Sequence, residues 1–181
     1  MSADFEKFSS SAELSIMLEL AKLDLKKRTT TAEMVFACCR WFPKRQALEM
    51  LIDFGIKSDS EDVTKAVFDY HDHEDYNCMI SLFTMATKYR NKTKKYPTGP
   101  MLHEIEECCF YLIELANMSG VDLKKYLNHT TKHGITLFDQ AAAYSKRLTL
   151  YLLKENAKIN SINSYFMTPS FRVRQSTDFL K

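Results

Sequence analysis

Five similar apolar segments recur along the chain at nearly regular intervals. They begin at Met17, Met50, Ser81, Tyr111 and Tyr151, so successive starts are separated by 33, 31, 30 and 40 residues. A second stretch of helical character precedes each of the later four segments, as in "TAEMVFACCRW" and "TLFDQAAAYS". This spacing is typical of arrays in which one helix pair stacks on the next. Because the chain has only four glycines and four prolines, we expect an all-α, short solenoid of antiparallel helix pairs.

A single domain over residues 1–181 accommodates this array, because a chain of this length forms one compact core or one short stack. We expect about four to five units, of which the terminal ones are incomplete. Gly55 is expected at a left-handed helix end in the second unit. The predicted units are residues 10–29 (partial), 30–62, 63–97, 98–132, 133–165 and 166–181 (partial).

The repeat pattern is clearest in residues 133–170. Phe138, Ala141 and Ala142 have the spacing of one helix face, and the small alanines allow a neighbouring helix to approach closely. Leucines at 148, 152 and 153 give the following helix its apolar side. Asn156 is expected to cap that helix at its C-terminus.

These residues resemble one nearly complete ankyrin repeat followed by the start of another. The resemblance depends on the helix-starting Thr136, the paired alanines and leucines, the turn "NAKIN", and a Thr-Pro step at Thr168, 32 residues after Thr136. It extends less specifically to residues 30–58 and, by spacing alone, over most of the chain. The resemblance implies a stack with hairpin-like turns between helix pairs and a concave contact face.

That resemblance implies a non-catalytic module that binds another protein through the concave face, as a scaffold, an inhibitor or a pathogen effector. A stack of helix pairs presents an extended surface and no deep pocket, so we expect no small-molecule substrate and no cofactor. Trp and Arg are frequent in binding hot spots. Candidate contacts, chosen by their predicted positions at turns, are Arg40, Trp41, His71, His73, Tyr144 and Arg147.

The stretch "DYHDHEDYNC", residues 69–78, is rich in metal-ligand residue types. On a helix, however, His71 and His73 would point about 200° apart. No second His and Cys cluster with zinc-finger spacing lies nearby. We therefore interpret the stretch as a solvated turn and expect no metal site.

Five cysteines allow an alternative, enzymatic interpretation in which Cys38 or Cys108 acts as a nucleophile with His71 or His103 as its base. No protease-like or transferase-like motif surrounds the cysteines, and the sequence "VFACC" places Cys38 on an apolar helix stripe. Free cysteine in such a position behaves as a small hydrophobic residue. We expect buried thiols and no catalytic residue.

The segment "KYRNKTKKY", residues 88–96, is the densest basic run and supports a second alternative, binding of anions or nucleic acid through residues 88–95. We place it in a solvated loop between units. The net charge of the whole chain is only +2, so no nucleic-acid partner is expected. No glycine-rich phosphate loop occurs, so nucleotide hydrolysis has no support.

An odd number of cysteines, with two adjacent pairs, is a poor framework for disulfides and fits a reducing compartment. The first ten residues lack the features of a secretory signal, and no apolar run reaches the length of a membrane span. We expect a cytoplasmic protein without a membrane partner, or one in the host cytosol if the chain is a pathogen effector.

Overall fold

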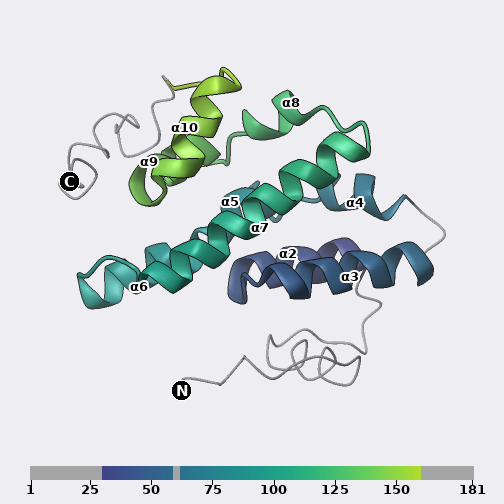
Figure 1. The fold of residues 1–181 in the computed structure, drawn as a ribbon, viewed down its shortest axis with the longest axis horizontal. Coiled ribbons are helices and arrows are strands. Elements are labelled where there is room, and N and C mark those ends of the chain that lie inside the picture. The colour runs from purple at the N-terminus through teal and green to yellow at the C-terminus, as the bar shows by residue number, and fades with distance from the viewer. Residues whose placement is uncertain (1–29, 59–61, 160–181) are drawn as a thin grey trace.

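The computed structural model describes residues 30–58 and 62–159, and these residues are mostly helical (Figure 1). No strand is assigned within those two ranges, so the all-α prediction is confirmed for them. The predicted terminal units 10–29 and 166–181, with the Thr-Pro step, lie outside the described residues. The helices are α2 (Thr31–Trp41), α3 (Arg45–Ser58), α4 (Val63–Asp69), α5 (Cys78–Leu82), α6 (Thr84–Thr93), α7 (Gly99–Met118), α8 (Leu123–Leu127), α9 (Leu137–Tyr144) and α10 (Lys146–Lys154).

The helices α2, α5 and α9 lie next to one another in space, with α5 in contact with both of the others. α7 packs on α3 and α5, and α10 packs on α9. Each of the three begins after a polar N-cap, namely Thr30, Asn77 or Thr136, whose side-chain oxygen accepts a backbone N–H from the first turn. These caps satisfy helix-end donors, which are buried at α5 and α9, and so they fix where the three helices start.

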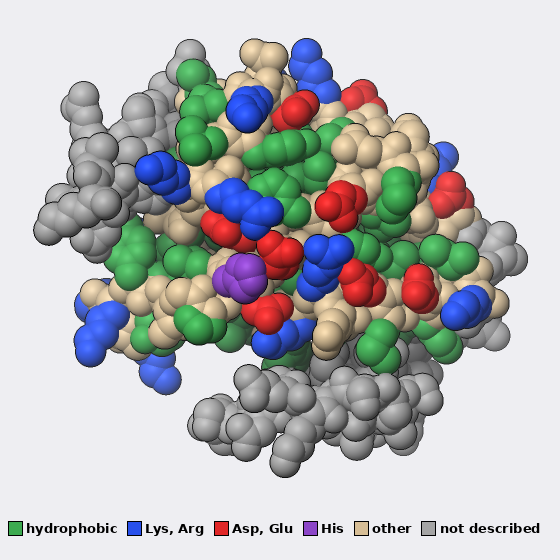
Figure 2. All heavy atoms as spheres, viewed as in Figure 1, with side chains coloured by type: hydrophobic (Ala, Val, Ile, Leu, Met, Phe, Trp, Pro, Cys, Tyr) green, Lys and Arg blue, Asp and Glu red, His purple; other side chains and the backbone are tan. Residues whose placement is uncertain are grey.

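The long helix α7 crosses the molecule and covers the neighbouring helices (Figure 1). Its buried side includes Ile105, Cys108, Cys109, Leu112 and Ala116, with the i, i+3, i+4 spacing of one helix face. Along its other side, acidic side chains of α7 lie among basic side chains of α3 and α10, as in the ion pairs of Glu107 with Arg45 and Arg147 (Figure 2). α7 therefore joins helices that are distant in the sequence into one core.

The C-terminal helix pair follows the predicted local pattern. Thr136 begins α9 and forms a capping box with Asp139, in which each side chain accepts the backbone N–H of the other residue. The alanines at 141 and 142 are fully buried. Asn156 has the left-handed φ of 53° just after α10, which confirms the predicted helix end. Leu153 differs from expectation because it is exposed while Leu152 is buried.

The middle of the chain departs from simple helix pairs. The predicted unit 63–97 contains the three short helices α4, α5 and α6, and the predicted unit 98–132 contains the long α7 and the short α8. The apolar segments used for the prediction indicate which helix faces are buried. They do not indicate where a helix is interrupted, so the additional helix ends were not predicted. The division of the chain into repeats remains a prediction.

Gly55 also has a different role from the one predicted. It lies inside α3, which continues to Ser58, and it is absent from the positions with positive φ. A Cβ atom at this position would lie 2.5 Å from Thr31 Cγ2 and 2.9 Å from Val63 Cγ1. Gly55 therefore permits a close approach between the C-terminal half of α3 and the starts of α2 and α4, which is a packing role and not a helix end.

Candidate functional site

The loop of residues 70–77, between α4 and α5, is held in shape by one carboxylate. Asp72 Oδ1 accepts the backbone N–H groups of Glu74 and Tyr76, both at 2.9 Å, and Asp72 Oδ2 pairs with Arg40 of α2 at 2.5 Å. Burial raises the pKa of Asp72, but these two N–H donors and Arg40 outweigh it, so the pKa lies below its usual value. The loop is thus a rigid, ionised turn anchored to α2.

A second loop, residues 128–136, packs against the first. Within it, Thr131 N–H donates to the carbonyl of Ile135 at 3.0 Å, and Gly134 has a φ of 72° that closes the turn. Between the loops, Lys132 N–H donates to the Glu74 carbonyl at 3.1 Å, and His133 Nε2 lies 3.0 Å from Glu74 Oε2. The two loops therefore form one continuous ridge beside α5 and α9.

A groove of about 760 Å³ lies between this ridge and α6. Ile80, Phe83, Ile135 and Ala143 give it apolar walls, while its remaining walls are polar or charged. Volumes of this size are typical of binding clefts, but those for small molecules are lined predominantly by apolar side chains. Residues of α2, both loops, α5, α6 and α9 line the groove, so it exists only in the folded chain: Arg40, Glu74, Tyr76, Ile80, Phe83, Thr84, Thr87, Lys88, Arg90, Asn91, Lys94, His133, Ile135, Gln140, Ala143 and Tyr144.

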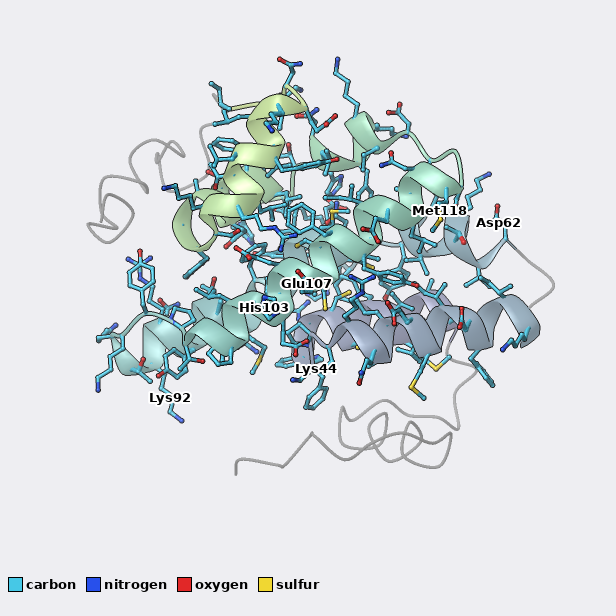
Figure 3. The ribbon with its side chains drawn as sticks, viewed as in Figure 1. Lys44, Asp62, Lys92, His103, Glu107 and Met118 are labelled. Carbon is cyan, nitrogen blue, oxygen red and sulfur yellow. The ribbon has the colours of Figure 1, made fainter. Side chains whose placement is uncertain are left out.

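The α6 wall of the groove is cationic. Lys88, Arg90 and Lys94 line it, and no ion pair joins any of the three to a carboxylate of the described residues. Lys and Arg side chains also gather at the α6 end of the face shown in Figure 2, where Lys92 is labelled in Figure 3. The cations beside α7 differ from those of α6, because Arg45 and Arg147 are both paired with Glu107 of α7. Three cations without an ion pair among the described residues are thus gathered along one wall of the groove.

Trp41 lies at the edge of the groove between two cations. Lys88 Nζ is 3.7 Å from the centre of the indole ring, and the guanidinium carbon of Arg40 is 5.7 Å from it. Burial and the nearby positive charge of Arg40 lower the pKa of Lys88. The aromatic face stabilises the two like charges only in part, so an anion close to Lys88 would relieve their repulsion.

Gln140 contributes an unpaired acceptor to the groove. It is 6% exposed, it lines the groove from α9, and its Oε1 atom is buried without a hydrogen-bond partner. A buried acceptor without a donor costs free energy that a suitable ligand restores. The position therefore favours a ligand that can donate a hydrogen bond.

Three of the six predicted contact residues gather at this groove, in different ways. Arg40 lines it but is partly used by the pair with Asp72. Trp41 is exposed beside it. Tyr144 lines the groove, but it is only 7% exposed, because its ring stacks on Phe83 with 6.1 Å between ring centres and its hydroxyl donates to Thr87. Its contact with a partner stays a prediction. Tyr144 packs the groove wall because α9 faces α5.

The other three predicted contacts lie elsewhere. His71 lines a second cavity of about 310 Å³ beside α4 and α8, where its ring stacks on His129 at 4.3 Å. His73 is exposed on the 70–77 loop. Arg147 lies over the Phe110 ring and pairs with Glu107 at 2.8 Å. In the described residues no group of three or more His, Cys, Asp or Glu side chains is placed to hold a metal ion.

The basic segment 88–95 was expected in a loop, but most of it belongs to α6, so this expectation is wrong. Its first part is the end of α6, and the helix stops where Lys94 adopts a left-handed φ of 58°. Thr84, Thr87, Lys88 and Asn91 then fall on the groove side at i, i+3, i+4 and i+7. This polar helical periodicity was the available signal, whereas no local pattern indicated Glu74 or Gln140.

All five cysteines are buried, as the sequence predicts. Burial raises the pKa of Cys38 to about 12 and raises the pKa of Cys39, Cys108 and Cys109 well above the usual range. The protonated thiol is not the nucleophile, so these positions lack the activated thiolate of a cysteine enzyme.

We therefore expect native protein to resist iodoacetamide and to become labelled at all five cysteines after unfolding in urea, as measured by mass spectrometry. Raising the pH from 7 to 9 should change native labelling of Cys38, Cys39, Cys108 and Cys109 little, because burial raises the pKa of these four thiols. Rapid labelling of Cys38 or Cys108 in the native state would contradict this and restore the enzymatic alternative.

No protein-family model, curated protein or solved structure matches the chain. Within the described ranges, the helices are also too short or too polar to cross a bilayer. The function proposed below is consequently argued from the residues of the groove.

Proposed function

We propose that this chain is a non-catalytic module that binds another protein in the groove between α6 and the two loops. The observation that carries the proposal is the groove itself, a channel of about 760 Å³ with apolar and polar walls and a cationic α6 side, built from six separate segments. Its rigid side is the ridge of the 70–77 and 128–136 loops, which are fixed by hydrogen bonds to each other and to α2. A rigid surface loses little conformational entropy when it binds.

The resemblance to ankyrin repeats supports the same function. In that family, turns and the first helices of the repeats form the concave contact face, and here two loops line the groove together with α2 and α9, the first helices of two predicted units. Thr136, the buried alanines and the left-handed Asn156 agree with the pattern on which the resemblance depends. Whether the chain is a scaffold, an inhibitor or an effector depends on the partner.

A binding role fits the chemistry of the groove better than catalysis. Cysteines are absent from its lining, and its one histidine, His133, pairs with its one carboxylate, Glu74. No thiol nucleophile is therefore available there. The cationic side chains can hold a charged partner, but they do not form a catalytic arrangement.

Site-specific photocrosslinking tests the proposed surface. A benzophenone amino acid is placed at Asn91, which is exposed and lines the groove, or at Gln46, which is exposed on α3 outside it. In lysate of cells that express the chain, we expect a discrete crosslinked protein from Asn91 and none from Gln46. Equal crosslinking from both positions, or none from Asn91, would count against the groove as the binding surface.

A further inference from the structure

The charge balance of the groove indicates what kind of segment it accepts. Four of its lining residues are Lys or Arg, namely Arg40, Lys88, Arg90 and Lys94, and its one acidic lining residue, Glu74, is already paired with His133. Arg40 is already paired with Asp72, so Lys88, Arg90 and Lys94 are the lining cations without an ion pair among the described residues. Complementary charge gives an interface its specificity and speeds association.

Lys88 is the cation with the most to gain from a negative ligand. Its ammonium group lies on the Trp41 ring, with the guanidinium of Arg40 on the same indole. Two like charges that share one aromatic side chain repel each other, and the only carboxylate of the described residues paired with either of them is Asp72. A carboxylate brought by a ligand would complete a charge-alternating arrangement at this end of the groove.

Gln140 sets a second requirement, which is that the ligand carries a hydrogen-bond donor. Its buried Oε1 atom has no partner, although Gln140 lines the same groove from α9. An extended polypeptide presents backbone N–H groups at regular intervals, together with side chains that alternate in direction. A peptide can therefore place carboxylates near α6 and one N–H group near Gln140 at the same time.

We propose that the groove binds an extended, Asp- or Glu-rich segment of the partner protein, with carboxylates at Lys88 and Lys94 and a backbone N–H at Gln140. This inference rests on the proposed function and specifies its ligand.

The observations favour a peptide over a nucleic acid. A phosphodiester backbone carries no hydrogen-bond donor for Gln140, and binding of single strands relies on aromatic rings on which bases stack. The rings that line the groove already have partners, because Tyr144 is buried against Phe83 and the Arg40 guanidinium carbon lies 5.9 Å from the centre of the Tyr76 ring. Trp41 is covered on one face by Lys88.

Selection from a phage library of random twelve-residue peptides tests the inference with defined probes. We expect the selected peptides to be enriched in Asp and Glu, and their fluorescein-labelled copies to bind with an affinity that falls as salt is raised. Trp41 is the only tryptophan, so its emission should change on binding as Lys88 moves relative to the ring. A labelled single-stranded oligonucleotide of twelve thymidines should bind much more weakly.

Two matched double variants locate the charge effect. Lys88→Gln with Lys94→Gln removes two lysines that line the groove, while Lys92→Gln with Lys95→Gln removes two lysines of the same segment that do not. Both variants change the net charge equally. We expect the first variant to bind a selected peptide with about tenfold lower affinity and the second with less than about twofold lower affinity. The reason is that salt screens surface charges, so each charge acts only on near neighbours.

Gln140→Leu separates a ligand contact from a structural role. Removing a buried oxygen without a partner should leave the melting temperature unchanged or higher, while a selected peptide binds several-fold more weakly. A purely structural glutamine would lower both stability and binding.

The outcomes separate the two proposals. Selected peptides without acidic enrichment, or acidic peptides that bind both lysine variants equally, would overturn the acidic ligand while leaving the protein-binding groove in place. Tighter binding of the oligonucleotide than of any peptide would overturn it in favour of a nucleic-acid ligand. No peptide enriched over a blank surface, together with no crosslink from Asn91, would remove the proposed function itself.

Discussion

Leu112→Ala should lower the free energy of unfolding by about 3 kcal/mol, because it removes a fully buried side chain at the centre of α7. α7 packs against α3, α4, α5 and α8, so the cavity would open where these helices meet. A loss of this size is a large fraction of the stability of an ordinary domain. Urea unfolding followed by circular dichroism measures the loss as a lower midpoint urea concentration, while the slope of the unfolding free energy against urea concentration stays unchanged.

Met118→Ala is the matched control on the same helix. Met118 is 76% exposed near the end of α7 (Figure 3), so its truncation opens no cavity and should change stability by less than about 0.5 kcal/mol. Equal, small effects of the two substitutions would mean that α7 does not form the core of this fold. A transition in which only part of the helical signal is lost would show that the described helices do not unfold as one unit.

Local chemistry explains which parts of the fold the sequence predicts. Thr136 and Asn156 determine their helix ends through their own backbone and side-chain bonds, and the alanines at 141 and 142 are buried because small residues suit close helix packing. The burial of the cysteines followed from their apolar neighbours. Each of these predictions needed only a few consecutive residues.

The groove depended on contacts that no local pattern contains. Arg40 meets Asp72 across 32 residues of sequence, and Tyr144 meets Thr87 across 57. Tyr144 was expected at an exposed turn because the helix opposite it was not known. The basic run that begins at Lys88 was assigned to a loop because the repeat spacing placed it between two units, whereas its first part is helical. Of the predicted contacts, only those near α6 came together.

Gly55→Val should destabilise the protein by about 2–3 kcal/mol, although most substitutions of a helical glycine are favourable. The new Cβ atom would lie 2.5 Å from Thr31 Cγ2 and 2.9 Å from Val63 Cγ1, closer than side-chain atoms tolerate. Both neighbours are buried and β-branched, so they cannot swing away. Valine gains only a few tenths of a kcal/mol in helix propensity over glycine, which is less than the cost of overpacking. Thermal and urea unfolding both measure the difference.

Gly99→Val and Thr31→Ala supply the control and the rescue for this prediction. A Cβ atom at Gly99, the first residue of α7, has no neighbour within 4 Å, so the same substitution there should change stability by less than about 0.5 kcal/mol. Thr31→Ala removes Cγ2 and Oγ1, the two threonine atoms that would crowd a Cβ at position 55. The double variant Gly55→Val with Thr31→Ala should therefore lose less stability than the sum of the losses of its two single variants. Strict additivity would show that α3 and the start of α2 are not in contact at Gly55, and the close packing of the first helix pair would have to be abandoned.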